Sequence, residues 1–155
     1  LAFLGFEPLH IMFMYAATQI YCNLVHTQTI HKMGFLETFM VTPSHHRVHH
    51  ASNTPYLDKN MGMLFIWWDK MFGTFEHEGR DPEPIRFGLV SPIESRNPVR
   101  MMLSEFVAIW RDVNQPNLTI GQRWMYVFGP PGWSHDGSKQ TSAQMQAVWN
   151  TQHPI

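Results

Sequence analysis

An uncharged stretch near the start of the chain constrains what this sequence can fold into. Residues 8–31 contain no Asp, Glu, Lys or Arg, and as a helix they would extend about 36 Å, enough to cross the hydrocarbon core of a bilayer. Amide and imidazole side chains interrupt the stretch at His10, Gln19, Asn23, His26 and Gln28. Such side chains at membrane depth usually face a helix bundle or a site. We predict a membrane-embedded helix here, with a buried helix of a soluble core as the alternative.

Composition limits the class of protein and its partners. Charged residues make up 15% of the 155 residues, below the roughly 25% usual in soluble domains, and 14% of the residues are aromatic. The formal net charge of -1 shows no basic excess, so no nucleic-acid partner is expected. A single cysteine excludes an intramolecular disulfide and a CxxC metal site.

Hydrophobic periodicity predicts two amphipathic helices in the second half of the chain. The first begins at Asn97 and could lie on a membrane surface or pack against its own domain. Its apolar stripe consists of Val99, Met102, Leu103, Phe106, Val107, Trp110 and Val113. The second follows Thr119, a typical N-cap residue, and stops at a Gly-Pro-Pro-Gly segment. We expect one domain over residues 1–133 and a polar tail over residues 134–155.

Four histidines gather within six positions, at His45, His46, His49 and His50. On a helix, with about 100° per residue, all four fall within an arc of about 140°, whereas a strand would divide them between its two faces. Crowded imidazoles disfavour one another's protonation, and neutral imidazole is the form that binds a metal. The cluster therefore predicts a metal site on a helix, with a hydrated surface cluster as the alternative.

His26 is the strongest further candidate for a metal ligand, and His31 and Cys22 are weaker ones. Imidazole suits Zn, Fe, Cu and Ni alike, and the sequence has no HExxH motif of the kind that zinc hydrolases use. The apolar context favours a hydrophobic substrate, whose C–H bonds need oxidising chemistry that an iron site can supply. The other histidines are interpreted as structural or exposed: His10, His77, His135 and His153.

Several segments together resemble one protein family. They are residues 25–27, 34–37, 42–50 (Thr-Pro-Ser-His-His-Arg-Val-His-His), 58–60, 66–75 and 129–133. With them the chain resembles the sterol desaturase-like branch of the fatty acid hydroxylase superfamily. The resemblance implies an all-α, membrane-embedded oxygenase fold, of which this chain is the C-terminal portion with amphipathic helices. It also implies an integral membrane enzyme that uses two Fe, O2 and an unknown electron donor to hydroxylate or desaturate a lipid, with its metal centre at the cytoplasmic face.

The resemblance also assigns metal ligands. His46, His49 and His50 match the last HxxHH box of the family, and His45 is the extra histidine common before it. His26 matches a single histidine near the end of the preceding transmembrane helix. The resemblance therefore implies that these histidines bind iron, with His45 either as a ligand or as an outer neighbour of the ligands.

The chain departs from the family pattern in one respect. Two earlier His boxes of the family, HxxxH and HxxHH, have no counterpart before His26. We therefore expect the chain to be part of a longer enzyme and to be inactive by itself. Two other interpretations are a non-catalytic membrane protein whose cluster binds a structural Zn, and a zinc-dependent lipid hydrolase.

Overall fold

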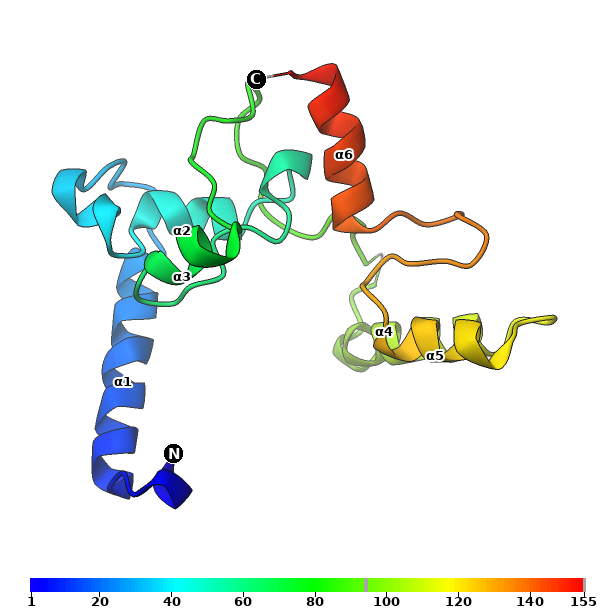
Figure 1. Ribbon diagram of the computed structural model, residues 1–155, viewed down its shortest axis with the longest axis horizontal. Coiled ribbons are helices and arrows are strands. Elements are labelled where there is room, and N and C mark those ends of the chain that lie inside the picture. The colour runs from blue at the N-terminus through cyan, green and yellow to red at the C-terminus, as the bar shows by residue number, and fades with distance from the viewer. Residues whose placement is uncertain (94, 155) are drawn as a thin grey trace. The chain divides into compact units, whose positions relative to one another are not determined.

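The computed structural model describes residues 1–93 and 95–154, which form helices and loops (Figure 1). The α-helices are α1 (Pro8–Val25), α2 (Pro43–His49), α3 (Trp67–Phe72), α4 (Pro98–Val113), α5 (Ile120–Phe128) and α6 (Ser142–Gln152). Short 3-10 helices span Ala2–Leu4, Gly34–Thr38 and Thr54–Tyr56. The described residues form no strand, only two isolated bridges, Met40–Phe65 and Ala51–Phe87. The expectation of an all-helical protein is confirmed.

The chain divides into two compact units, residues 1–88 and the residues from Leu89 onward, and each is described by itself. The first contains α1, α2 and α3, and the second contains α4, α5 and α6. This division falls within the region predicted as one domain. The region expected to be a polar tail includes α6, which begins at a capping box formed by Thr141 and Gln144.

The helix α1 covers the first part of the uncharged stretch. It has Pro8 at its first position, where the missing N–H of proline costs no hydrogen bond. It ends at Val25, and the amides of Gln19 and Asn23 lower its mean hydropathy. No helix in the described part of the chain is both long enough and apolar enough to cross a membrane. The predicted membrane-embedded helix is therefore not confirmed.

The first unit has a small apolar core and an interior rich in polar groups. Val48, Ala51 and Tyr56 form a buried cluster against which Ile85 packs. Its buried polar residues are Thr42, Ser44, His45, Arg47, Asn53, Asn60, Asp69 and Asp81. Because buried polar groups are stable only when they are hydrogen-bonded, the contacts of these side chains hold the unit together.

Two buried asparagines join distant segments of this unit. The side-chain amide of Asn60 donates to the carbonyl of His45 at 3.2 Å and to the carbonyl of Glu76 at 2.9 Å. The amide of Asn53 donates to Asp81 Oδ2 at 2.9 Å. These bonds attach the first turn of α2 and the loop after it to the charged segment that follows α3.

The second unit confirms both predicted amphipathic helices. The side chain of Asn97 caps α4 by accepting from the backbone N–H groups of Val99, at 3.0 Å, and Arg100, at 3.3 Å. Thr119 caps α5, and its hydroxyl accepts from the backbone N–H of Gln122 at 3.3 Å. The helices therefore begin where the sequence signals place them.

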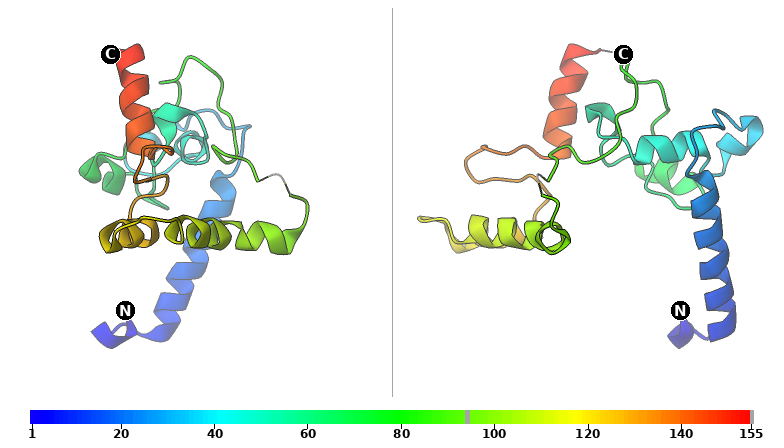
Figure 2. Two further views of the ribbon diagram at one scale, coloured as in Figure 1. Left: turned by 90° about the vertical axis from the view of Figure 1, so that its right-hand side faces the viewer. Right: turned by 180° about the vertical axis from the view of Figure 1, so that it is seen from behind.

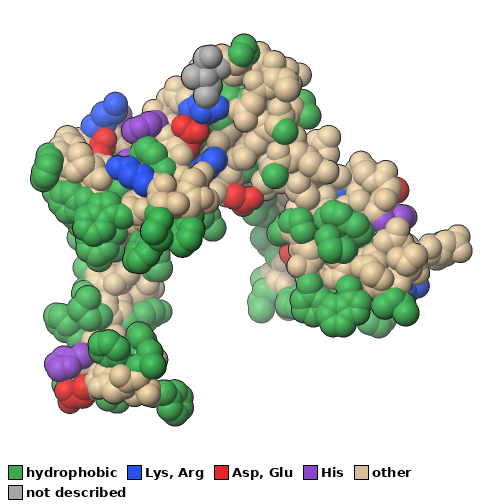
Figure 3. Space-filling view, in the orientation of Figure 1, with side chains coloured by type: hydrophobic (Ala, Val, Ile, Leu, Met, Phe, Trp, Pro, Cys, Tyr) green, Lys and Arg blue, Asp and Glu red, His purple; other side chains and the backbone are tan. Residues whose placement is uncertain are grey.

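The apolar stripes of α4 and α5 stay exposed within the described residues of this unit. Figure 2 shows the two helices at one level. α4 runs across the left view, and in the right view α5 runs across while α4 is seen end-on. In Figure 3 hydrophobic side chains gather along the lower side of this unit. Phe106 and Trp110 on α4 are 71% and 72% exposed, and Phe128 on α5 is 72% exposed. Within its own unit most of the α4 stripe is therefore not covered, and the choice between a membrane surface and packing against the rest of the domain stays a prediction.

Candidate metal centre

The helix α2 carries the histidine cluster, and its first residues explain why the segment is helical. Thr42 has an extended backbone and Pro43 takes the first helical position, an order that favours helix initiation. Val41 and Val48 have no exposed surface, so one side of α2 is anchored in the unit. His50 follows the helix as its C-cap residue and stays exposed.

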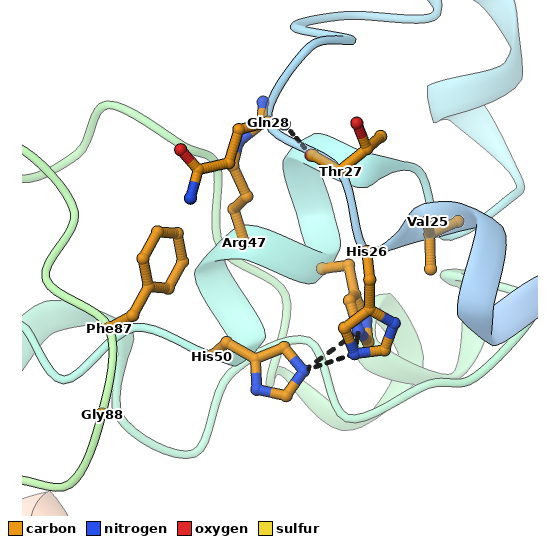
Figure 4. A pocket seen from close by; sticks show the side chains of 9 residues that line it. Val25, His26, Thr27, Gln28, Arg47, His50, Phe87 and Gly88 are labelled. Carbon is orange, nitrogen blue, oxygen red and sulfur yellow. Dashed lines mark hydrogen bonds between the residues drawn. The ribbon is translucent and has the colours of Figure 1, made fainter.

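Three imidazole rings meet where the end of α1 faces α2 (Figure 4). The Nε2 atom of His26 lies 2.8 Å from Nε2 of His46 and 3.1 Å from Nε2 of His50. The Nε2 atoms of His46 and His50 are 3.1 Å apart. Among the residues that the structure describes, no other group of three His, Cys, Asp or Glu side chains brings its ligand atoms within 4.8 Å of one another.

The protonation of the triad leaves at least one lone pair directed at its centre. Nδ1 of His26 lies 2.6 Å from the carbonyl oxygen of Cys22, and since a carbonyl only accepts, Nδ1 carries the proton and donates. In neutral imidazole the other nitrogen then has a lone pair. A single Nε2 either donates or accepts, so three mutual contacts cannot all be hydrogen bonds. A cation bound by all three lone pairs satisfies every one of these nitrogens.

The spacing of the three nitrogens fits one metal ion. Ligand nitrogens about 2.1 Å from a metal, at right angles to one another, are separated by about 3.0 Å. The observed separations of 2.8, 3.1 and 3.1 Å bracket this value. His26, His46 and His50 therefore have the donor atoms and the spacing for three adjacent ligands of a single ion.

The surroundings of the triad keep two of its members neutral. Burial, and then the neighbouring His26, His50 and His49, lower the pKa of His46 to about 4. Burial, and then His49 and His26, lower the pKa of His50 from its ordinary value. At neutral pH both rings are thus in the form that binds a metal.

The other two predicted ligands lie differently. His49 stacks on His46 with ring centroids 5.6 Å apart, and its buried Nδ1 has no hydrogen-bond partner among the described residues. His45 is 1% exposed, and its Nδ1 lies 3.2 Å from the carbonyl oxygen of Met40 rather than beside the triad. Burial lowers the pKa of His45 as well. Its ring packs edge-on against Phe75, which explains why it does not converge with the other three.

Two further residues support the centre: Arg47, to which the sequence analysis gave no role, and Asp69, which can be interpreted from the sequence as a turn or cap residue. Arg47 lies between the two histidine pairs of α2, and its side chain binds Glu78 through Nη2 at 2.6 Å. Asp69 on α3 is 2% exposed and accepts hydrogen bonds from two backbone N–H groups. An arginine inside a histidine cluster and an aspartate inside an apolar run are the signals that could have identified them.

Cavities open on both sides of the triad. One of about 330 Å³ is bounded by the three histidines and by Val25 and Phe87 (Figure 4). The other, of about 310 Å³, is bounded by the same histidines with His49 and Met63. Volumes of this order accommodate part of an apolar ligand, so a small molecule could reach the ring nitrogens from either side.

The first unit also carries the sequence of a known family. Residues 1–74 match the family described as fatty acid hydroxylase. These residues belong to the fatty acid hydroxylase family. The resemblance inferred from the histidine segments is thus confirmed, and the hydroxylase-family segment contains α1, α2, α3 and the whole triad.

Relatives of the chain agree with this family. Alkylglycerol monooxygenase of Homo sapiens is 37% identical over 114 residues, which cover 74% of this chain and 25% of the relative. Alkylglycerol monooxygenase of Caenorhabditis elegans is 38% identical over 127 residues, covering 75% of this chain and 24% of the relative. A Delta(7)-sterol 5(6)-desaturase of Aspergillus fumigatus is 36% identical over 73 residues, covering 47% of this chain and 20% of the relative.

These relatives are consistent with the sterol desaturase-like branch of the superfamily. The chain spans about a quarter of the length of the alkylglycerol monooxygenases it matches. No solved structure matches it.

Proposed function

We propose that this chain is the C-terminal part of an iron-dependent, O2-using lipid hydroxylase or desaturase. The observation that carries the proposal is the spacing of the Nε2 atoms of His26, His46 and His50, which suits one metal ion. The fatty acid hydroxylase family and the relatives named as a monooxygenase and a desaturase support the reaction class.

In this proposal His26, His46 and His50 bind one iron. His49 is assigned to the second iron, because its buried Nδ1 is unpartnered and it borders the second cavity beside the triad. The further ligands of that second iron come from outside this chain. His45 keeps an outer position, since its Nδ1 faces the carbonyl of Met40 and its own carbonyl accepts from Asn60.

In this proposal the side chains of this chain bind iron, orient its ligands and shield the site from water. Bound iron supplies the redox chemistry that oxidation of an unactivated C–H bond by O2 requires. The carbonyl of Cys22 fixes the tautomer and orientation of His26, and burial keeps His46 neutral. Val25 and Phe87 give the neighbouring cavity apolar walls, which would hold a lipid chain and exclude water.

We further propose that the enzyme works at a lipid bilayer, with the metal centre at its cytoplasmic face and a separate electron donor as a partner. Exposed aromatic and sulfur-containing side chains on α3 support contact with lipid: Trp67, Trp68, Met71 and Phe72. Tryptophan is enriched where proteins meet the bilayer interface.

Metal content tests the assignment of the centre. The chain reconstituted with Fe(II) under anaerobic conditions should retain iron, and His50→Ala should lose most of it because one of three ligands is gone. His10→Ala is the matched control, since His10 is an exposed histidine of α1 paired with Glu7. Full iron retention in His50→Ala contradicts the proposal. One tightly bound Zn that Fe(II) does not displace supports the structural-zinc alternative instead.

Product formation tests the reaction class in the complete enzyme. His46→Ala should abolish both O2 consumption and the oxidised lipid product, measured by mass spectrometry with an alkylglycerol and a sterol as trial substrates. Lipid cleavage without O2 consumption would support the hydrolase interpretation and contradict the oxygenase.

A further inference from the structure

Arg47 has every donor of its guanidinium occupied. Nε donates to Glu78 Oε1 at 2.8 Å and Nη2 donates to Glu78 Oε2 at 2.6 Å. The remaining donors bind carbonyl oxygens: Nη1 those of Thr27, at 3.1 Å, and Ile30, at 2.9 Å, and Nη2 that of His31, at 3.0 Å. A guanidinium has five N–H donors, so this side chain is fully matched to its surroundings.

The three carbonyls belong to the segment that directly follows His26. This segment is not helical, and α1 has ended before it. Its own contacts are local, such as the hydrogen bond between the hydroxyls of Thr27 and Thr29 at 2.8 Å. Arg47 therefore ties the backbone after His26 to α2, the helix that carries His46 (Figure 4).

Glu78 holds the arginine in place for this contact. It binds two guanidinium nitrogens side by side, the geometry in which arginine and a carboxylate pair most strongly. Arg47 is only 9% exposed, so an unpaired guanidinium here would be costly. Burial acts to raise the pKa of Glu78, but the hydrogen bonds from Arg47 and Ser44 outweigh it and the net pKa is lowered. The carboxylate thus stays charged at neutral pH.

From these contacts we infer that Arg47, braced by Glu78, is a positioning residue that sets His26 against His46 and His50. His26 is the C-cap residue of α1 and lies twenty positions before His46 on α2, so no single helix sets the separation of their nitrogens. Arg47 fixes this separation, because it directly follows His46 and its side chain binds the backbone of the residues that follow His26. This inference rests on the proposed metal centre and adds to it a residue that touches neither metal nor substrate.

The test measures the affinity of the full 155-residue chain for Co²⁺ by competition with a chelating dye. Arg47→Lys keeps the charge but has three donors and no planar fork, so it should bind Co²⁺ about 10- to 100-fold more weakly, the usual loss when an outer partner of a ligand is removed. Glu78→Gln should weaken binding in the same direction. Arg86→Lys is the matched control, because Arg86 pairs with Glu83 at an exposed position, and it should bind as the wild type does.

A double variant separates positioning from a general effect on the fold. Arg47 acts through His26 in this inference, so Arg47→Lys should cost little further affinity in a chain that already carries His26→Ala. An equal loss in both backgrounds would overturn the inference, and so would wild-type affinity in both Arg47→Lys and Glu78→Gln. If Arg47→Lys does not fold, as judged by circular dichroism, Glu78→Gln decides. A wild-type chain that binds no Co²⁺ would overturn the proposed centre itself, which distinguishes the two failures.

Discussion

Asp69 carries a carboxylate within α3, among mostly apolar residues, and only 2% of its surface is exposed. Its carboxylate accepts from the backbone N–H of Met61 at 2.6 Å, from that of Gly62 at 2.9 Å and from the hydroxyl of Thr74 at 2.7 Å. A Cβ added at Gly62 would lie 2.7 Å from Oδ2 of Asp69, so the backbone there approaches the carboxylate closely. One side chain thus holds the loop before α3 and the residues after it.

Asp69→Asn should lower the free energy of unfolding by about 2 to 3 kcal/mol, because one accepting oxygen becomes a donor that faces another donor. Urea unfolding followed by circular dichroism measures the loss. Asp58→Asn is the control, since Asp58 is exposed and has a left-handed backbone with φ 54 that asparagine also adopts. An equal effect of the two substitutions would contradict the role assigned to Asp69.

Glu78 should give stability a dependence on pH. Because its pKa is lower in the folded protein than its ordinary value of 4.5, its contribution is complete above that value and is lost as the pH falls through the folded pKa. The difference in unfolding free energy between wild type and Glu78→Gln should therefore be largest near neutral pH and shrink in acid. Unfolding by urea at a series of pH values measures it. If the difference in unfolding free energy does not change with pH, the charge of Glu78 is not what stabilises the folded protein.

His45 shows the limit of a residue-level prediction. Helical geometry predicts that the clustered histidines share one side of the helix, and the rings of His46, His49 and His50 do lie side by side, with centroids 4.6 to 5.6 Å apart. The same arc included His45, whose ring instead faces Met40 and Phe75. The angular position of a residue on a helix says nothing about contacts with other segments. For His45, at the start of α2, the contacts with Met40 and Phe75 decide the direction of the side chain.

At the scale of elements, the local signals of α4 and α5 were sufficient. Asn97 and Thr119 mark the starts of these helices in the sequence, and both side chains cap them in the structure. Thr42 and Pro43 likewise stand at the start of α2, as its N-cap residue and its first helical residue. Capping depends on residues within one turn of each other, which is why sequence reasoning finds it. Asp69, by contrast, bonds residues up to eight positions away, beyond the reach of such patterns.

The cap of α4 can be measured directly. Asn97→Ala should lower stability by about 1 kcal/mol, since two backbone N–H groups lose their acceptor. Asn97→Asp keeps an acceptor at the same place and should retain most of the stability. Thermal unfolding of both variants gives the comparison, and equal losses for Ala and Asp would contradict a capping role.

At the scale of the whole molecule, the number of metal ions follows from the ligands that one chain provides. The described residues bring together one group of three ligand atoms, and His49 alone stands beside it. We therefore expect the isolated chain to bind about one metal ion and to oxidise no lipid. Metal analysis against protein concentration, together with a lipid oxidation assay, tests this. Two bound irons with product formation would contradict it.

The sequence by itself determined the local features of this protein: an all-helical chain, the caps of its helices, a histidine cluster on a helix, and the match of residues 1–74 to the fatty acid hydroxylase family. Each depends on residues close together along the chain. Only the tertiary structure decided that His26 meets His46 and His50, and that Arg47 binds Glu78, thirty-one positions later. Contacts at such separations depend on how loops and buried polar groups pack, which no local periodicity encodes.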